Sequence, residues 1–225
     1  MHRRMTEKRR WLLAGAVLLS APGKLSAAPP ASAPPAVAPS QATKSPAPAS
    51  GKTQPEASAR PHRRTLHERL LAAEKALAMA GNEKQARELA DQAEALRSRA
   101  LTGSTRMLLT DSQEALGKND FQTAEEDMTS ALTIQPDQFI LRRQRAAVRL
   151  AAGDNNGAIE DLGIELQSDP GDPTAWGMLA EAEHERHEPD AALRAYHQMM
   201  LLDPKAPDAD RQLKTLQKEK EGQED

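Results

Sequence analysis

The residues whose types and spacing could do chemistry gather towards the C-terminal end of the sequence. His184 and His187 lie near Glu181, Glu185 and His197, and imidazole with carboxylate groups can bind a transition metal. However, His184 and His187 also fall at the end of a predicted helix, where the helix dipole favours an imidazolium, and His187 occupies the following turn. The helix end accounts for both histidines, so neither a metal site nor any other cofactor is expected.

A second candidate is the arginine run LRRQRAAVRL at residues 141–150, which could form a nucleic-acid-binding stripe. No aromatic side chain interleaves this run, although stacking on bases requires one. Residues 65–225 hold 19 Lys and Arg against 31 Asp and Glu, and an acidic body repels phosphate backbones. Nucleic-acid binding is therefore not expected.

Other catalytic patterns are missing from the sequence. It has no cysteine, which excludes disulfide bonds, thiolate metal sites and a cysteine nucleophile. It contains no nucleophile elbow, no phosphate-binding glycine loop and no zinc-binding spacing. We therefore assign no catalytic residue and do not expect an enzyme.

The elements that hold these residues are predicted to be helical. The whole chain has two Trp, one Tyr and two Phe, too few aromatic residues for a strand-rich core. Ala, Leu, Glu, Gln, Lys and Arg dominate the body and favour helix. We expect an all-α body that begins near residue 65.

Residues 1–27 predict a secretory signal peptide. They combine a basic start, an apolar run at 11–21 and small residues near Ala27. The apolar run is shorter than the about 20 residues of a membrane span, but an uncleaved signal anchor stays open. Arg9 and Arg10 leave both general secretion and the twin-arginine route open. In every case we expect the body to be exported, and to be periplasmic or anchored to the outer face of the inner membrane of a bacterium.

Residues 28–64 are rich in Pro, Ala and Ser and contain almost no large apolar side chain. Such a segment buries too little apolar surface to offset its ordering entropy. It is predicted to be a disordered linker with polyproline-II character.

The body contains a repeat with a period of 34 residues. Three prolines keep this step, as do three alanines that are each followed four positions later by a larger side chain. The pattern indicates two helices per repeat: the small alanine lets them approach, and the larger residue fills the space beside it. Proline ends the second helix because it has no amide hydrogen.

This pattern resembles the tetratricopeptide repeat (TPR) family, whose pattern has Trp, Leu, Gly and Tyr in a first helix, then Ala, an aromatic residue and Pro. Residues 173–206 match best, residues 139–172 match in the second helix, and residues 105–138 match less closely. The matching residues are Ala124, Met128, Pro136, Ala158, Leu162, Pro170, Trp176, Leu179, Ala192, Tyr196 and Pro204. The resemblance also implies a structural pair between Arg145 and Asp161.

The resemblance implies an all-α, antiparallel helix-hairpin solenoid, a TPR-like superhelix of about three repeats: 105–138, 139–172 and 173–206. Residues 65–104 begin with the capping box TLHE and contain a Gly81-Asn82 turn. They form either a degenerate fourth repeat or a plain helical hairpin that caps the array. Residues 207–225 are predicted to form a capping helix with a polar tail.

In the TPR family the first helix of each repeat lines a concave groove. The residues at those positions here are Arg106, Leu109, Gln113, Leu116, Ile140, Arg143, Ala147, Leu150, Glu181, His184 and Glu185. This floor is apolar and basic with an acidic end, so it implies a partner peptide or helix with apolar anchors and an acidic portion that meets Arg106 and Arg143. We expect Arg143→Glu to weaken partner binding and to spare the fold.

Together these observations predict an exported protein-protein interaction module or scaffold that binds a peptide or helix of another envelope protein. Two alternatives stay open: a self-associating structural subunit of an envelope assembly, and a regulatory subunit of a cell-envelope polysaccharide enzyme. We expect the protein to contact the membrane only through its N-terminal segment, and only if that segment stays uncleaved.

Overall fold

A computed structural model describes residues 64–222, which lie within the second of two compact units, Ser58–Asp225. The predicted signal peptide, and the predicted linker up to residue 63, lie outside the described residues. The helices are α1 (Leu66–Ala78), α2 (Glu83–Arg97), η3 (Ser98–Ala100, a 3-10 turn), α3 (Gly103–Gly117), α4 (Phe121–Ile134), α5 (Phe139–Ala152), α6 (Asn155–Ser168), α7 (Pro173–Glu185), α8 (Pro189–Leu202) and α9 (Ala209–Glu221). No strand occurs among the described residues. Between residues 64 and 222, no helix combines the length and the hydropathy that a bilayer crossing requires.

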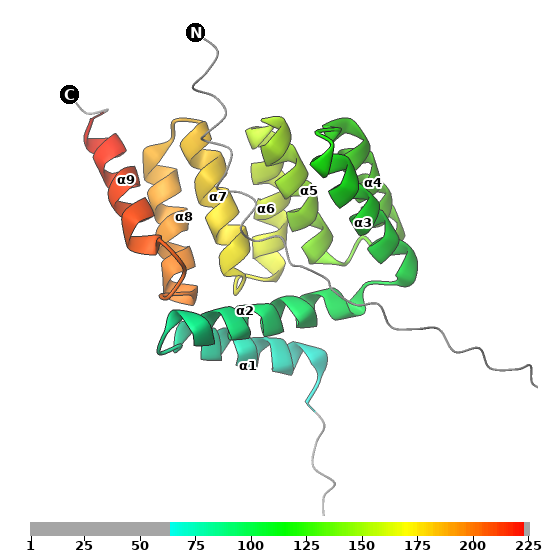
Figure 1. Cartoon of the computed structure of the whole chain (residues 1–225), viewed down its shortest axis with the longest axis horizontal. Coiled ribbons are helices and arrows are strands. Elements are labelled where there is room, and N and C mark those ends of the chain that lie inside the picture. Colours follow the sequence, from blue (N-terminus) through cyan, green and yellow to red (C-terminus); the bar gives the residue numbers. More distant parts are fainter. Residues whose placement is uncertain (1–63, 223–225) are drawn as a thin grey trace, which may run out of the picture. The chain divides into compact units, whose positions relative to one another are not determined.

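Helices α3 to α8 form three antiparallel hairpins that stack in chain order (Figure 1). Each helix packs most extensively against its hairpin partner, and α4 packs on α5 as α6 packs on α7. The first helices, α3, α5 and α7, also contact their neighbours in that layer more closely than α4, α6 and α8 do in theirs. The first helices therefore form the inner, concave layer. The predicted all-α hairpin solenoid is confirmed.

One backbone position defines the turn inside each hairpin. Asn119, Gly153 and His187 have φ angles of 59°, 86° and 61°, in the left-handed region that reverses the chain after a helix. Asp120 and Asp154 follow the first two of these turns, and each carboxylate accepts a hydrogen bond from a backbone N–H in the first turn of the next helix. The turn residues therefore recur at the same period as the core.

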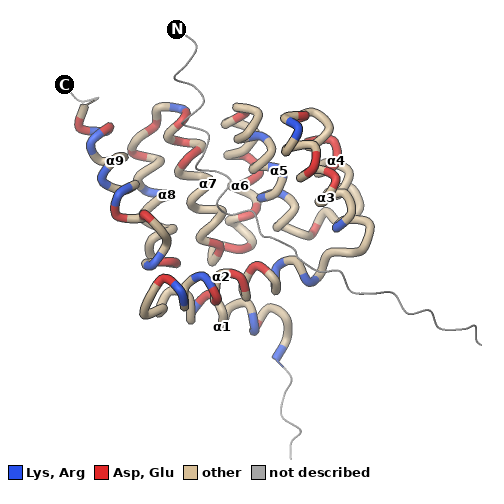
Figure 2. Tube along the Cα trace, viewed as in Figure 1, with Lys and Arg blue, Asp and Glu red and all other residues tan. Residues whose placement is uncertain are grey.

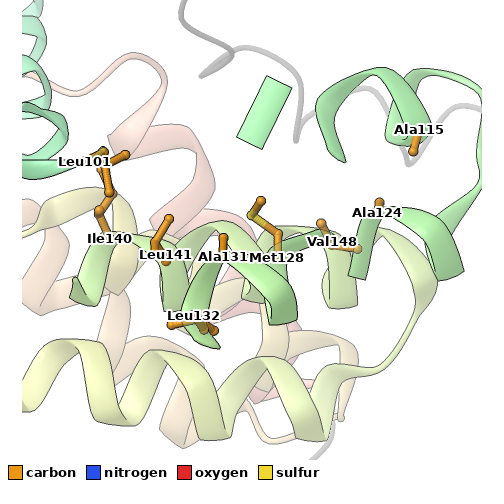
Figure 3. Packing of buried hydrophobic residues seen from close by; sticks show 9 residues of the cluster. All are labelled: Leu101, Ala115, Ala124, Met128, Ala131, Leu132, Ile140, Leu141 and Val148. Carbon is orange, nitrogen blue, oxygen red and sulfur yellow. The ribbon is translucent and has the colours of Figure 1, made fainter. Parts of the chain in front are cut away.

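The alanines of the repeat are the closest contacts between paired helices. Ala124, Ala158 and Ala192 are each 0% exposed. The larger residues four positions later, Met128, Leu162 and Tyr196, are also buried. Figure 3 shows the cluster of the first repeat, in which side chains of α3, α4 and α5 pack together with Leu101. Small and large side chains thus alternate along each second helix, as the sequence spacing predicts.

Helix α9 covers the end of the array beside α8. Leu216 is buried in the cluster that also contains Tyr196. The Tyr196 hydroxyl lies 3.0 Å from the Ala209 carbonyl oxygen and 2.9 Å from the Gln212 side-chain oxygen. The polar helix predicted after residue 207 therefore packs against the last hairpin through one apolar face.

The α1–α2 hairpin does not continue the stack. It runs across the ends of the repeat helices, and α1 contacts α8, whereas α2 makes no comparable contact with α3 or α4 (Figure 1). Its two apolar clusters, built on Ala73, Leu77, Ala86, Ala93 and Leu96, contain only hairpin residues. In the structure the hairpin folds back along one edge of the array.

Ala192→Leu should destabilise the array. Ala192 is fully buried between α8 and its neighbours, and the larger side chain overpacks a filled space at a cost of about 1–3 kcal/mol. Arg194→Leu, at an exposed position of the same helix, is the matched control and should change the free energy of unfolding by less than about 0.5 kcal/mol. Thermal melting followed by circular dichroism compares the two. Equal melting temperatures would contradict the assigned helix contact.

Candidate functional site

The accessible apolar part of the concave face lies on α3 and the second half of α5. Gln113 is exposed, and Leu109 and Leu116 are half-buried against the cluster of the first repeat. Ala147 on α5 is also half-buried. These four predicted groove residues offer a mostly apolar surface with one amide group.

The two arginines expected to meet an acidic partner are engaged within the chain. Arg106 is exposed, but its guanidinium donates to the Leu101 carbonyl oxygen at 2.7 and 3.1 Å. Arg143 is only 3% exposed, and it donates to Asp172 and, at 2.6 Å, to both carboxylate oxygens of Glu94. In this structure Arg143 is a structural residue, because α2 lies over it.

Two further predicted groove residues are also buried. Ile140 is 5% exposed in the first-repeat cluster, where Leu101 is another member, and Leu150 is 8% exposed in the next cluster. Both residues support the packing of the array. The linker after α2 accounts for the burial of Ile140, because it brings Leu101 into the same apolar cluster at the start of α5.

The end of α7 is acidic. Glu181 is half-buried, and its burial together with the neighbouring Glu185 raises the pKa of Glu181 to about 7. His184 Nδ1 lies 3.2 Å from a carboxylate oxygen of Glu219 on α9. Glu185 is exposed. The end of α7 therefore carries two carboxyl groups, Glu181 and Glu185, beside His184.

A cluster of buried charges joins the α1–α2 hairpin to the array; we call it the hairpin ion cluster. It consists of Arg97, Arg143, Glu74, Glu94, Glu165, Asp169 and Asp172. Arg97 donates at 2.6 Å to Glu74 of its own hairpin and at 2.6 Å to Asp169 of the loop before α7. Figure 2 shows the charged stretches of α2 facing the acidic segment between the C-terminal end of α6 and the N-terminal end of α7. Five carboxyl groups thus surround two guanidinium groups.

Asp172 is the centre of this cluster. One carboxylate oxygen accepts hydrogen bonds from the backbone N–H groups of Thr174 and Ala175 at 2.9 and 3.4 Å, which caps α7. The other oxygen accepts from Arg143 and lies 3.6 Å from Arg97 Nε. Burial opposes the charge of Asp172, but Arg143 and Arg97 hold its pKa below the ordinary value. Asp172 is therefore ionised in the folded protein.

Two carboxyl groups of the cluster bind protons more tightly than usual. Glu165 is 1% exposed, and its Oε2 has no hydrogen-bond partner. Burial, and then the charge of Asp172, raise the pKa of Glu165 to about 9. Burial and the neighbouring Asp169 raise the pKa of Glu74 to about 7. The excess of carboxyl groups over arginines is thus reduced by protonation.

The carboxylates do not require a metal ion. Glu165, Asp169 and Asp172 offer oxygen atoms within 4.8 Å of one another. However, the oxygens of both aspartates already accept from guanidinium or backbone N–H groups, and Arg97 and Arg143 supply the positive charge. We therefore interpret the group as an ion-pair network.

Three arginines of the α5 run surround a second buried carboxylate, that of Asp161. Arg145 donates to Asp161 at 2.7 and 2.8 Å, the pair that the sequence predicts between the two helices. Arg149 and Arg142 approach the same carboxylate at 3.0 and 3.4 Å. With Arg143 in the hairpin ion cluster, all four arginines of the run have acidic partners within the chain.

Comparisons with known proteins bear on the fold. No protein-family model matches the chain, and neither does any curated protein. The crystal structure of the Sgt2 TPR domain from Aspergillus fumigatus matches with 27% identity over 56% of this chain and 84% of that one, at a TM-score of 0.51. The fold is TPR-like. A MamA RS-1 ArsTM double mutant and MamA 41-end from Desulfovibrio magneticus RS-1 each match with 17% identity and a TM-score of 0.49, over 68% of this chain and 83% and 84% of theirs.

Sequence reasoning missed the hairpin side of the ion cluster. Glu74, Glu94 and Arg97 lie in a polar helical pattern whose spacing carries no information about distant partners. A local signal exists on the array side, where Asp172 before Pro173 is a typical start of a helix. Gly171 is a second signal, because a Cβ at that position would overlap the Glu74 carboxylate.

Arg143→Glu should unfold or strongly destabilise the TPR-like array. The change removes a buried partner of Asp172 and Glu94 and adds a carboxylate among them, which costs about 3–5 kcal/mol or more. Arg194→Glu, on the exposed side of α8, is the control and should be nearly neutral. Urea denaturation of both variants measures the difference. A fold as stable as the parent in Arg143→Glu would show that Arg143 is not buried in solution.

Glu165→Gln should make stability less dependent on pH. The folded pKa of about 9 lies above the ordinary 4.5, so between these values the folded protein holds a proton that the unfolded chain has lost. The free energy of unfolding therefore falls as pH rises through this window, by up to about 1.4 kcal/mol per pH unit.

A glutamine at this position has no proton to lose, so the variant does not share the parent's loss of stability as pH rises. The difference in the free energy of unfolding, variant minus parent, should therefore grow between about pH 5 and pH 8.5, inside the window that the two pKa values of Glu165 define. Urea denaturation across that range measures the gain, and Glu160→Gln at an exposed position of α6 is the control. Parallel pH profiles for the parent and Glu165→Gln would contradict the assigned protonation.

Proposed function

We propose that this protein is an exported, non-enzymatic scaffold that binds a peptide or helix of another envelope protein on the concave face of its TPR-like array. The accessible surface formed by Leu109, Gln113, Leu116 and Ala147 supports this proposal, because these residues lie on the inner layer and Gln113 is exposed. Apolar side chains next to an amide suit a segment with apolar anchors and exposed backbone or polar groups.

The charge on this face refines the partner's chemistry. Arg106 and Arg143 are engaged by the chain itself, whereas the α7 end presents Glu181 and Glu185. A partner segment with apolar residues over α3 and a basic residue towards the end of α7 fits this arrangement better than the acidic segment expected from the sequence. Export through residues 1–27 and work in the periplasm remain part of the proposal.

Gln113→Arg should reduce partner capture without harming the fold. An added guanidinium at this exposed position disrupts the apolar surface, whereas Ser130→Arg on α4 places the same charge on the outer layer. The tagged full-length protein is used for affinity capture from solubilised cell envelope, with intact mass recorded to show whether the leader was removed. Capture by Gln113→Arg should fall roughly tenfold, or about 1.4 kcal/mol, while Ser130→Arg behaves like the parent.

Equal capture by both variants would contradict the concave site. Recovery of only this protein, as an oligomer, would favour the self-associating subunit. Recovery of a polysaccharide enzyme together with it would favour the regulatory subunit. A single mass that includes residues 1–27, in a soluble fraction, would contradict export.

A further inference from the structure

The α1–α2 hairpin shares no apolar cluster with the array; ion pairs join it to the array beside the contact of α1 with α8. Its apolar clusters contain none of the residues of α3 to α9, and the clusters of α3 to α9 contain no residue of α1 or α2. The strong contacts across the interface are ion pairs: Glu94 with Arg143, and Arg97 with Asp169. A surface held in this way lacks the shared apolar core that makes a domain contact permanent.

Helix α2 presents these two charges one helical turn apart. Glu94 and Arg97 are separated by three residues, so they lie on one face of α2. The array presents the matching pattern, with Arg143 opposite Glu94 and with Asp169 and Asp172 around Arg97. The array surface is therefore complementary to a helix that carries a carboxylate and a guanidinium three positions apart.

We propose that the α1–α2 hairpin is a reversible cover, and that the array surface beneath it is a binding site for a partner helix that carries a carboxylate and a guanidinium one turn apart. In the closed state the hairpin's own Glu94 and Arg97 occupy this site. Opening the hairpin exposes Arg143, Asp169 and Asp172 to the partner. This site is distinct from the accessible surface on α3, so it does not depend on the proposed function.

The charge balance of the hairpin ion cluster makes the cover sensitive to pH. Glu74 of α1 faces Arg97 of α2 and Asp169, and the other charged groups of the cluster are Glu94 on α2, Arg143 on α5, Glu165 on α6 and Asp172. The pKa of Glu74, raised to about 7 in the closed state, returns towards its ordinary value when the hairpin leaves. The closed state therefore binds more protons, and it weakens as pH rises through 7.

Opening of the cover is tested in the full chain by distance measurement. The chain has no cysteine, so cysteines at the exposed positions Gln92 and Gln198 give two unique sites for spin labels, one on α2 and one on α8. The parent should give one narrow distance at pH 6 and a broader, longer distribution at pH 8.5, reversibly. Arg97→Gln should open the hairpin even at pH 6, because it removes the guanidinium that joins α2 to Asp169 and leaves that half-buried carboxylate without its cation.

Arg87→Gln is the matched control. Arg87 lies on the same helix but is exposed and pairs only within α2, with Glu83. It should leave the distance unchanged. A narrow distance that persists in Arg97→Gln and at pH 8.5 would overturn the proposal, as would a doubled mass that keeps the labels close, because the hairpin would then be exchanged between two copies.

Recognition by the uncovered site is tested with a peptide of residues 83–97 as the probe. Because Arg97→Gln removes the competing hairpin, this variant should bind the peptide at least about tenfold more tightly than the parent and the Arg87→Gln control. The same peptide with Glu94→Gln and Arg97→Gln should lose this gain. If the two peptides bind Arg97→Gln equally well, the proposed recognition is overturned. The same holds if the hairpin of Arg97→Gln is open but the affinity for the peptide of residues 83–97 does not rise above that of the parent. Circular dichroism melting of each protein variant shows that α3 to α9 stay folded.

Discussion

The ion pair between Arg143 and Asp172 is the contact on which the arrangement of the described residues depends. It connects α5 to the first turn of α7, and the second oxygen of Asp172 caps α7. The hairpin attaches at this same point through Glu94 and Arg97. A buried ion pair adds little net stability compared with apolar packing, because its charges must be desolvated. We therefore interpret its main effect as orientation: it sets where the hairpin lies.

The repeat could be predicted from the sequence because its geometry is local. Ala158 and Leu162 are one helical turn apart, and the turn at Gly153 and the cap at Asp154 lie within the same hairpin. Each contact therefore involves residues that are close in the chain or one repeat apart, and the same spacing recurs. For this reason the all-α class followed from residue types, and the resemblance to the TPR family implied the Arg145–Asp161 contact.

The hairpin position could not be predicted in this way. Arg97 meets Asp169 across 72 positions of sequence, and no periodicity links such residues. For the same reason Arg143 and Ile140 looked like groove residues. They occupy first-helix positions that face inward, and only the placement of α2 and of Leu101 shows that the chain itself covers them. The assignment of a helix face is local, whereas accessibility of that face depends on the whole chain.

The return of α1 and α2 onto later helices changes the order in which the molecule can be completed. A plain array of hairpins adds each unit to the one just made, so its contacts form as the chain emerges. Here α1 and α2, which are synthesised before the array, dock on the loop before α7 and on α8, which are made much later. With 13 and 15 residues, α1 and α2 are marginal as isolated helices in water. The hairpin therefore reaches its final position only after the loop before α7 has been made, so a chain that stops before Asp169 lacks the array carboxylates that Arg97 binds.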